Sequence, residues 1–170
     1  MASTELSEKW YYDACTLDHR LATYGEIINK GHKSYTSHLA VGEACSSCLL
    51  KAGDTKNYEI LDFFVDLLKK LRNIEQLEIV SNDHVESILR KISEIVPVLS
   101  ITDSLHLATA LREQCCVFRT IDNDFNGLTK SVCEELAHEN GMSRFAVSSM
   151  SPKDREQLFR DKKVVNRKKK

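Results

Sequence analysis

Apolar residues in this chain form four short runs bounded by polar residues, a pattern typical of buried strands. The runs lie at residues 9–15 (KWYYDAC), 77–80 (LEIV), 115–121 (CCVFRTI) and 144–149 (RFAVSS). Longer segments with helical periodicity separate them. The order therefore predicts strands that alternate with helices.

The clearest helical segment lies at residues 57–72, where apolar residues recur at i, i+3, i+4 and i+7. This stripe consists of Ile60, Leu61, Phe64, Leu67, Leu68 and Leu71, with Phe63 beside it. Further helices are predicted at residues 17–30, 37–52, 83–96, 103–111 and 128–140. Their predicted N-caps include Thr36 or Ser37, Asn82 or Asp83, and Thr102.

Strands that alternate with helices favour a mostly parallel sheet covered on both faces. The predicted fold class is α/β, a three-layer α/β/α sandwich with a central, mostly parallel sheet. The 170 residues, 42% of them hydrophobic and 29% charged, suit one soluble domain with a sizeable core. We expect a single domain at residues 1–150, followed by a charged tail at residues 151–170.

The charge of the chain is distributed unevenly. The last eleven residues, RDKKVVNRKKK, hold seven Lys or Arg and one Asp, so they carry +6 while the chain as a whole carries −1. The body is therefore acidic at −7. A basic tail of this kind is usually solvated and disordered, and sometimes contacts nucleic acid.

No run approaches the ~20 apolar residues of a membrane helix, and the N-terminal MASTELSEKW lacks the pattern of a signal peptide. We expect a cytoplasmic protein with no membrane partner. The six cysteines then suit reduced, mostly buried thiols. Cys45 and Cys48 form a CxxC, but no second such pair completes a tetrahedral zinc site.

Four carboxylates occur in apolar surroundings. Asp13 and Asp122 come at the carboxyl ends of predicted strands, where ligands gather in α/β folds. Glu43 shares a helical stripe with apolar residues, and Asp103 opens a helix, where the macrodipole alone also favours an acid. An isolated buried carboxylate is costly, so a hard metal ion is the simplest reason to collect several.

Other chemistry has weaker support. The chain contains no GxxxxGK[ST], GxGxxG or GxSxG motif, which argues against P-loop, dinucleotide and serine-hydrolase enzymes. His106 lies three residues after Asp103, on nearly the same helix face, so it either hydrogen-bonds a carboxylate or is a satisfied core histidine. Asp18 comes early in the helix that follows Asp13, and we interpret it as a surface charge or as a charge at the N-terminus of that helix.

The series YYDAC, HLAVGEACSSCLL, ITDSLHLATAL and FRTIDNDF resembles the PIN-domain family of metal-dependent ribonucleases, which includes the toxin nucleases of toxin–antitoxin modules. The resemblance covers roughly residues 10–148. Asp13, Glu43, Asp103 and Asp122 occupy the family's acidic places in order. Family members often have Ser or Thr directly after the first Asp, where this chain has Ala14.

The resemblance implies a Mg²⁺- or Mn²⁺-dependent ribonuclease. It suggests Asp13 and Asp103 as direct metal ligands, Asp122 as a direct or water-mediated ligand, and Glu43 as a ligand of water or of a second ion. Asp124 is a further candidate ligand or a solvated loop acid. The supporting residue is Thr120, which matches the hydroxyl residue common before the last acid.

The implied partner is RNA, and the implied role is that of a toxin-type endoribonuclease with an antitoxin-like protein partner. Basic residues that could contact RNA include Lys51, Arg90, Lys91 and Arg119. The wide apolar stripe at residues 57–72 also suggests a homodimer or an antitoxin-binding groove. The alternatives are a catalytically silent PIN-fold scaffold and another α/β metal phosphohydrolase.

Overall fold

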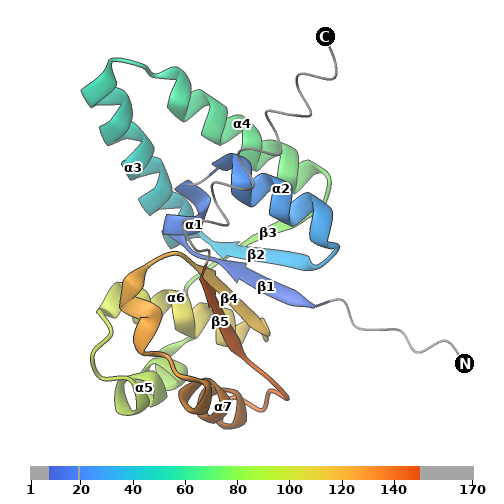
Figure 1. Cartoon of the computed structure of the whole chain (residues 1–170), viewed down its shortest axis with the longest axis vertical. Coiled ribbons are helices and arrows are strands. Elements are labelled where there is room, and N and C mark those ends of the chain that lie inside the picture. Colours follow the sequence, from blue (N-terminus) through green and yellow to red (C-terminus); the bar gives the residue numbers. More distant parts are fainter. Residues whose placement is uncertain (1–7, 19, 150–170) are drawn as a thin grey trace, which may run out of the picture.

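The computed structural model describes residues 8–18 and 20–149 (Figure 1). Its centre is a five-stranded sheet in the order β3-β2-β1-β4-β5, with every neighbouring pair parallel. The strands are β1 (Lys9–Tyr12), β2 (Lys33–Ser37), β3 (Leu77–Val80), β4 (Val117–Thr120) and β5 (Ala146–Ser149). The predicted α/β/α sandwich with a parallel sheet is confirmed.

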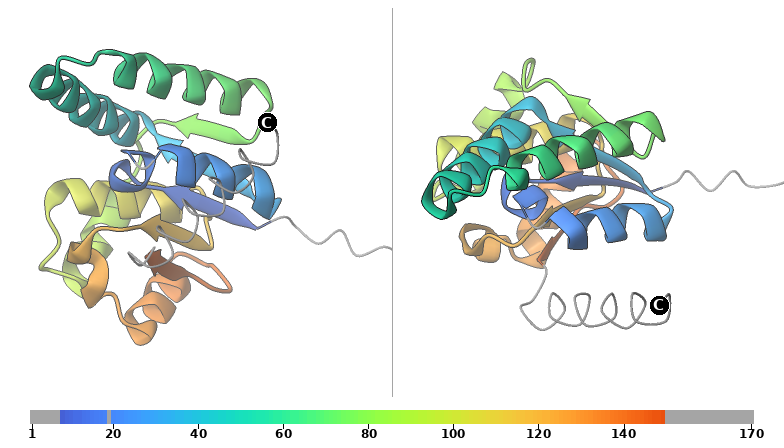
Figure 2. Two further views of the ribbon diagram at one scale, coloured as in Figure 1. Left: turned by 45° about the horizontal axis from the view of Figure 1, so that its top comes forward. Right: turned by 90° about the horizontal axis from the view of Figure 1, so that it is seen from above.

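Helices cover both faces of this sheet (Figure 2). The helices of one face are α1 (Ala14–Asp18), α2 (Arg20–Lys30), α3 (His38–Thr55) and α4 (Glu59–Asn73). The helices of the other face are α5 (Glu86–Ile95), α6 (Ile101–Arg112) and α7 (Lys130–Glu139), together with the 3-10 turn η1 (Asn123–Gly127). Two hydrophobic cores result, one on each side.

Successive residues of β1 belong to different cores, because side chains alternate across a strand. Tyr11 packs with Phe118 and α6, whereas Tyr12 packs with Leu17, Ile27 and the α3–α4 pair. Both tyrosines are completely buried. The short run WYYD therefore anchors both halves of the sandwich.

Sequence patterning failed to predict β2, the neighbour of β1. Its five residues, KSYTS, contain a single large apolar side chain, Tyr35, yet four of the five are buried. Their polar groups are largely satisfied inside the protein, as when the Thr36 hydroxyl donates to the Tyr12 carbonyl at 2.8 Å. The helix predicted at residues 17–30 corresponds to the end of α1 and to α2, which lie on either side of residue 19, outside the described residues.

Two predicted helix caps were wrong. Ser100, not Thr102, caps α6, and its hydroxyl accepts a hydrogen bond from the Asp103 backbone N–H at 3.1 Å. Helix α5 begins only at Glu86, with Val85 at its N-cap, so neither Asn82 nor Asp83 caps it. The Asn82 side chain instead accepts a hydrogen bond from the Leu39 N–H at 3.1 Å and donates one to the Thr109 hydroxyl at 2.9 Å.

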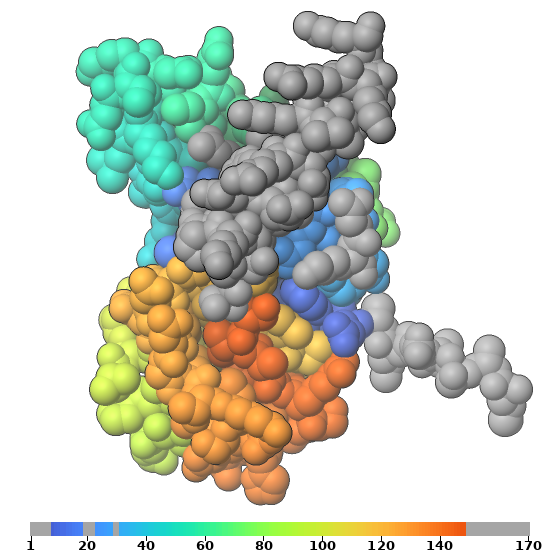
Figure 3. All heavy atoms as spheres, viewed as in Figure 1, coloured from blue at the N-terminus to red at the C-terminus, as the bar shows by residue number. Residues whose placement is uncertain are grey.

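Helices α3 and α4 form the end of the molecule opposite to α5 and α7 (Figure 3). The stripe on α4 is divided between core and surface. Phe64, Leu68 and Leu71 are buried, while Phe63 is 45% exposed. The amphipathic helix predicted at residues 57–72 is thus present, and part of its apolar surface faces outward.

Within the described ranges, no helix has both the length and the apolar character needed to cross a membrane. The predicted basic tail at residues 151–170 lies outside the described residues.

Candidate metal-binding active site

Asp13 and Asp122 lie at the same edge of the sheet because they follow adjacent parallel strands. Tyr12 of β1 is in register with Arg119 of β4, and the Asp13 N–H continues the ladder by donating to the Arg119 carbonyl at 3.3 Å. Asp122 comes two residues after the end of β4. The carboxyl edge of the sheet therefore holds both acids, as expected for a ligand site in an α/β fold.

A pocket of about 240 Å³ opens at this edge. The described residues that line it are Asp13, Ala14, Cys15, Asp18, Glu43, Ala44, Ser47, Asp103, His106 and Asp122. All four acids singled out from the sequence are among them. They come from the end of β1, from α3, from the first turn of α6 and from the loop after β4.

Asp13 is the most deeply buried of the four, with 3% of its surface exposed. Its Oδ1 accepts hydrogen bonds from the Thr16 N–H at 2.9 Å and from the Thr16 hydroxyl at 2.7 Å. Burial raises the pKa of the Asp13 carboxyl, although hydrogen bonds from Thr120 and Thr16 act in the opposite direction. The ionised form of Asp13 thus lacks solvation that a bound cation would replace.

Thr120, predicted as a supporting residue, is fully buried and connects two acids. Its hydroxyl contributes a hydrogen bond to Asp13 and accepts one from the Asp122 N–H at 2.9 Å. The Asp122 carboxylate also accepts from the Asp124 N–H at 3.0 Å and from the Cys15 thiol at 3.7 Å. Burial and nearby carboxylates raise the pKa of Cys15 to about 12, so the thiol remains a donor.

Asp103 is held by the cap of its own helix. Its Oδ2 accepts a hydrogen bond from the Ser100 hydroxyl at 2.6 Å, and the Asp103 backbone N–H donates to Ser100 Oγ in return. This reciprocal pair resembles a capping box and fixes the carboxylate at the start of α6. Oδ1 accepts no hydrogen bond from the described residues, which leaves it available to the pocket.

Glu43 is held by His106. Its Oε2 lies 2.7 Å from His106 Nε2, and the two side chains are 38% and 4% exposed respectively. His106 is therefore buried, as a core histidine would be, but it also contacts a pocket carboxylate. The sequence left these two interpretations open, and both hold.

Asp18 was wrongly interpreted as a surface charge. Its side chain is only 16% exposed, lines the pocket and pairs with Lys51 of α3. It also accepts a hydrogen bond from the Ser47 hydroxyl at 3.1 Å. Glu43, Ser47 and Lys51 succeed each other at four-residue steps along α3, so one helix face presents all three toward this region.

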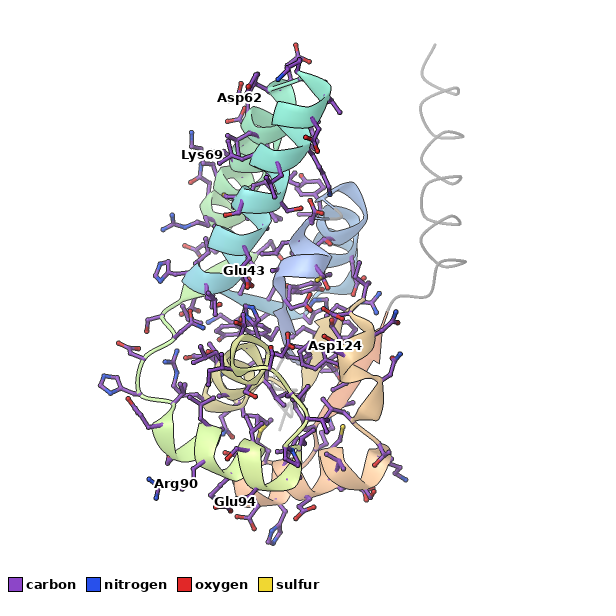
Figure 4. All side chains as sticks on the ribbon, turned by 90° about the vertical axis from the view of Figure 1, so that its left-hand side faces the viewer. Glu43, Asp62, Lys69, Arg90, Glu94 and Asp124 are labelled. Carbon is purple, nitrogen blue, oxygen red and sulfur yellow. The ribbon has the colours of Figure 1, made fainter. Side chains whose placement is uncertain are left out.

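Three other candidate residues lie away from the pocket. Asp124 lies on η1 and is not among the described lining residues, although its N–H orients Asp122 (Figure 4). Arg119 was expected at the surface for RNA contact, but it is 6% exposed and pairs with Glu26 in the interior at 2.9 Å. Arg90 lies on α5, at the other end of the molecule from α4 (Figure 4).

The donor set of the pocket fits a hard cation. Its oxygen ligands are carboxylates, the type that Mg²⁺ and Mn²⁺ prefer. Its acids outnumber its basic lining residues, since His106 is the one basic side chain among the described residues that line it. In the described part of the chain, no group of three or more His, Cys, Asp or Glu side chains lies in an arrangement that could hold a metal ion as it stands.

The protein-family model described as PIN domain matches residues 12–130, a span that includes all four of these acids. No curated protein gives a significant match. PIN domains are generally nucleases that use divalent metal ions, and PIN nucleases act on RNA.

Proposed function

Because the chain belongs to the PIN-domain family, we propose that it hydrolyses RNA phosphodiester bonds with Mg²⁺ or Mn²⁺. The observation that carries this proposal is the convergence of Asp13, Glu43, Asp103 and Asp122 on one pocket from four separate elements. Mutually repelling carboxylates destabilise an empty fold, so their collection favours a cation-dependent function over a purely structural one.

Each acid has a role that follows from its contacts. Asp13 and Asp103 would hold the metal directly, with Asp122 directly or through water. Glu43 would orient a water molecule through Oε1, because His106 occupies Oε2. Asp124 acts indirectly, by holding Asp122 through its N–H. A bound divalent ion supplies Lewis-acid stabilisation of phosphate charge and lowers the pKa of a bound water.

The surface next to the pocket supports an extended substrate. A shallow groove of about 620 Å³ shares Glu43 and Ser47 with the pocket and continues along α3 past Gly42 and Leu50. Lys51 lies at the same helix face and could exchange its Asp18 partner for a phosphate. An RNA strand that follows α3 would therefore pass the acids of the pocket with the positive charge of Lys51 beside it.

The direct test is cleavage of single-stranded RNA by purified protein with Mn²⁺ or Mg²⁺, stopped by chelation. Asp13→Asn and Asp103→Asn should each lower the rate at least ~100-fold while leaving the fold intact, because each removes a ligand charge. Glu94→Gln is the control: Glu94 is an exposed acid on α5, so this variant should cleave normally. Full activity of either Asp variant contradicts the assignment.

The same experiment separates the alternative functions. A silent scaffold would neither cleave RNA nor gain thermal stability from millimolar Mn²⁺, whereas binding to the folded state alone must raise the melting temperature. Another phosphohydrolase would bind the metal but leave RNA intact and act on phosphate monoesters. RNA cleavage that requires Asp13 contradicts both alternatives.

A narrower form of the proposal is a toxin-type endoribonuclease with an antitoxin-like partner. Its expected result is that expression of the wild type, but not of Asp13→Asn, arrests growth of a bacterial host. Growth arrest by both proteins, or by neither, contradicts the toxin role while leaving the nuclease assignment to the cleavage assay.

The proposal extends to self-association through α4. The outward-facing Phe63 supports it, because this exposed aromatic lies one helical turn before the half-buried Leu67 and leaves apolar surface on the outside of the helix. Light scattering should show a dimer that Phe63→Glu dissociates. A wild-type monomer, or a dimer unchanged by Phe63→Glu, contradicts this surface.

A further inference from the structure

A buried chain of hydrogen bonds runs from the pocket into the centre of the sheet. His106 joins Glu43 through Nε2 at 2.7 Å, and its Nδ1 lies 3.0 Å from the Tyr11 hydroxyl. Tyr11 donates to Ser37 Oγ at 2.8 Å. Every member except Glu43 is buried, so this series of hydrogen bonds leads from a half-exposed carboxylate to the protein interior.

The direction of the first bond follows from the chemistry of its partners. An ionised carboxylate can only accept hydrogen bonds, so His106 Nε2 carries the hydrogen that points to Glu43. The Tyr11 hydroxyl donates its single hydrogen to Ser37 Oγ, so toward His106 Nδ1 it can only accept. Burial raises the pKa of the Tyr11 hydroxyl far above its usual range, so this partner keeps its hydrogen.

The interior end of the chain is fixed by packing. The Tyr11 ring stacks on Phe118 with ring centroids 5.4 Å apart and an interplanar angle of 9°. Ser37 Oγ also accepts the Ala40 N–H at 3.1 Å, which makes it the N-cap of α3. The same oxygen therefore determines where the helix that carries Glu43 begins and anchors the residues that hold its carboxylate.

Glu43 needs such a partner to keep one orientation. A glutamate has three rotatable side-chain bonds, and this one is 38% exposed, so without a bond its carboxylate would sample several positions. His106 holds Oε2, while Oε1 accepts no hydrogen bond from the described residues. One oxygen is thus restrained and the other is left for a ligand.

We propose that His106 is a positioning residue that acts through Glu43: anchored by Tyr11 and Ser37, it holds the Glu43 carboxylate in the orientation that binds the divalent cation or its water. This inference rests on the proposed metal-dependent function. Partners of this kind, which orient a ligand without touching the metal, typically contribute 10–100-fold, as an order of magnitude, to metal affinity.

Two replacements of His106 separate its two ring nitrogens. His106→Gln places an amide N–H near the position of Nε2 and can still donate to Glu43. His106→Asn places its amide near the position of Nδ1, so it keeps the contact with Tyr11 and loses the one with Glu43. A purely structural histidine would make these variants differ in stability only.

The experiment is calorimetric titration of each variant with Mn²⁺, together with thermal melts in chelator. We expect His106→Asn to weaken Mn²⁺ binding about 10-fold or more and His106→Gln to recover most of that loss. In a Glu43→Gln background, His106→Asn should have no further effect on Mn²⁺ binding, because the residue it acts through has already changed.

Three results overturn the inference. Mn²⁺ affinity unchanged in His106→Asn shows a structural histidine. Tighter Mn²⁺ binding in His106→Asn shows that His106 competes with the metal for Glu43. Equal losses with and without Glu43→Gln show that the two residues act separately.

The controls keep this test apart from the proposed function. A wild type that binds Mn²⁺ and cleaves RNA, with no response to His106→Asn, contradicts the inference alone; a wild type that binds no Mn²⁺ contradicts both. If neither His106 variant folds, Tyr11→Phe decides instead, since it removes only the anchoring hydroxyl and should weaken Mn²⁺ binding several-fold by this mechanism.

Discussion

Tyr11 and Tyr12 are neighbours on β1, but their hydroxyls enter two different polar networks. The Tyr11 hydroxyl leads through His106 to Glu43 and the acidic pocket. The Tyr12 hydroxyl lies 2.7 Å from His32 Nε2, beside the buried pair of Glu26 and Arg119. One network opens to solvent and the other is enclosed.

The two networks differ in how their charges are balanced. The side chains of Glu26 and Arg119 are 3% and 8% exposed. Arg119 donates hydrogen bonds both to Glu26 and to the Ser148 carbonyl, the latter at 3.2 Å. An enclosed acid is thus matched by one base. The pocket instead gathers acids beyond its basic groups, which costs stability that only a bound cation or solvent restores. A buried acid paired with a base, such as Glu26 with Arg119, stabilises the fold, whereas acids without enough basic partners at a sheet edge favour a cation-binding role.

The largest expected effect on stability comes from breaking the matched pair. Arg119→Met leaves the Glu26 charge buried without its partner and should lower the free energy of unfolding by about 3–5 kcal/mol in urea titrations. Arg119→Met combined with Glu26→Leu should recover most of the loss. A double variant as unstable as Arg119→Met would show that Arg119 acts through packing rather than charge.

Removing an unmatched acid should do the reverse. In chelator at neutral pH, Asp13→Asn should raise the free energy of unfolding, because burial disfavours the ionised Asp13 carboxyl and the neutral Asn still accepts the bonds from Thr16. Thermal melts of the two proteins measure the difference. A loss of stability in Asp13→Asn would show that the Asp13 charge stabilises the fold, as the paired charges of Glu26 and Arg119 do.

The pH dependence of that difference has a definite sign. The pKa of Asp13 is raised by burial, so the folded state binds more protons than the unfolded state, where an Asp titrates at about 3.9. The destabilisation should therefore be absent below about pH 3.9, grow as the pH rises from there to the raised pKa, and be complete above it. The melting temperatures of wild type and Asp13→Asn should diverge in this direction.

The smallest expected effects distinguish the two tyrosines. Tyr11→Phe and Tyr12→Phe each remove one buried hydroxyl and should each cost about 1 kcal/mol of stability. Only Tyr11→Phe should also weaken Mn²⁺ binding, since among the described residues the Tyr12 hydroxyl contacts Glu26 and His32, neither of which lines the pocket. Equal effects of both variants on Mn²⁺ affinity would erase the distinction between the networks.

The local pattern of apolar and polar residues predicted the helices and strands that bury apolar side chains. The runs that became β1, β3, β4 and β5, and the stripe of α4, could be identified because their side chains match one periodicity. Strand β2 could not, since Ser34, Thr36 and Ser37 are buried there as polar residues. A polar strand in the centre of a sheet is stabilised by partners that local composition does not reveal.

The candidate site divides in the same way. The order of residues along the chain was enough to predict that Asp13 and Asp122 come after strands, that Glu43 lies on an apolar helix stripe and that Asp103 lies at the start of a helix. Each of these positions depends only on neighbouring residues in the sequence. Only the tertiary structure decided that His106 contacts Glu43, 63 residues away, and that Arg119 pairs with Glu26, 93 residues away. Whether a charged side chain is solvated, paired or collected in a pocket depends on which distant residues the folded sheet brings beside it.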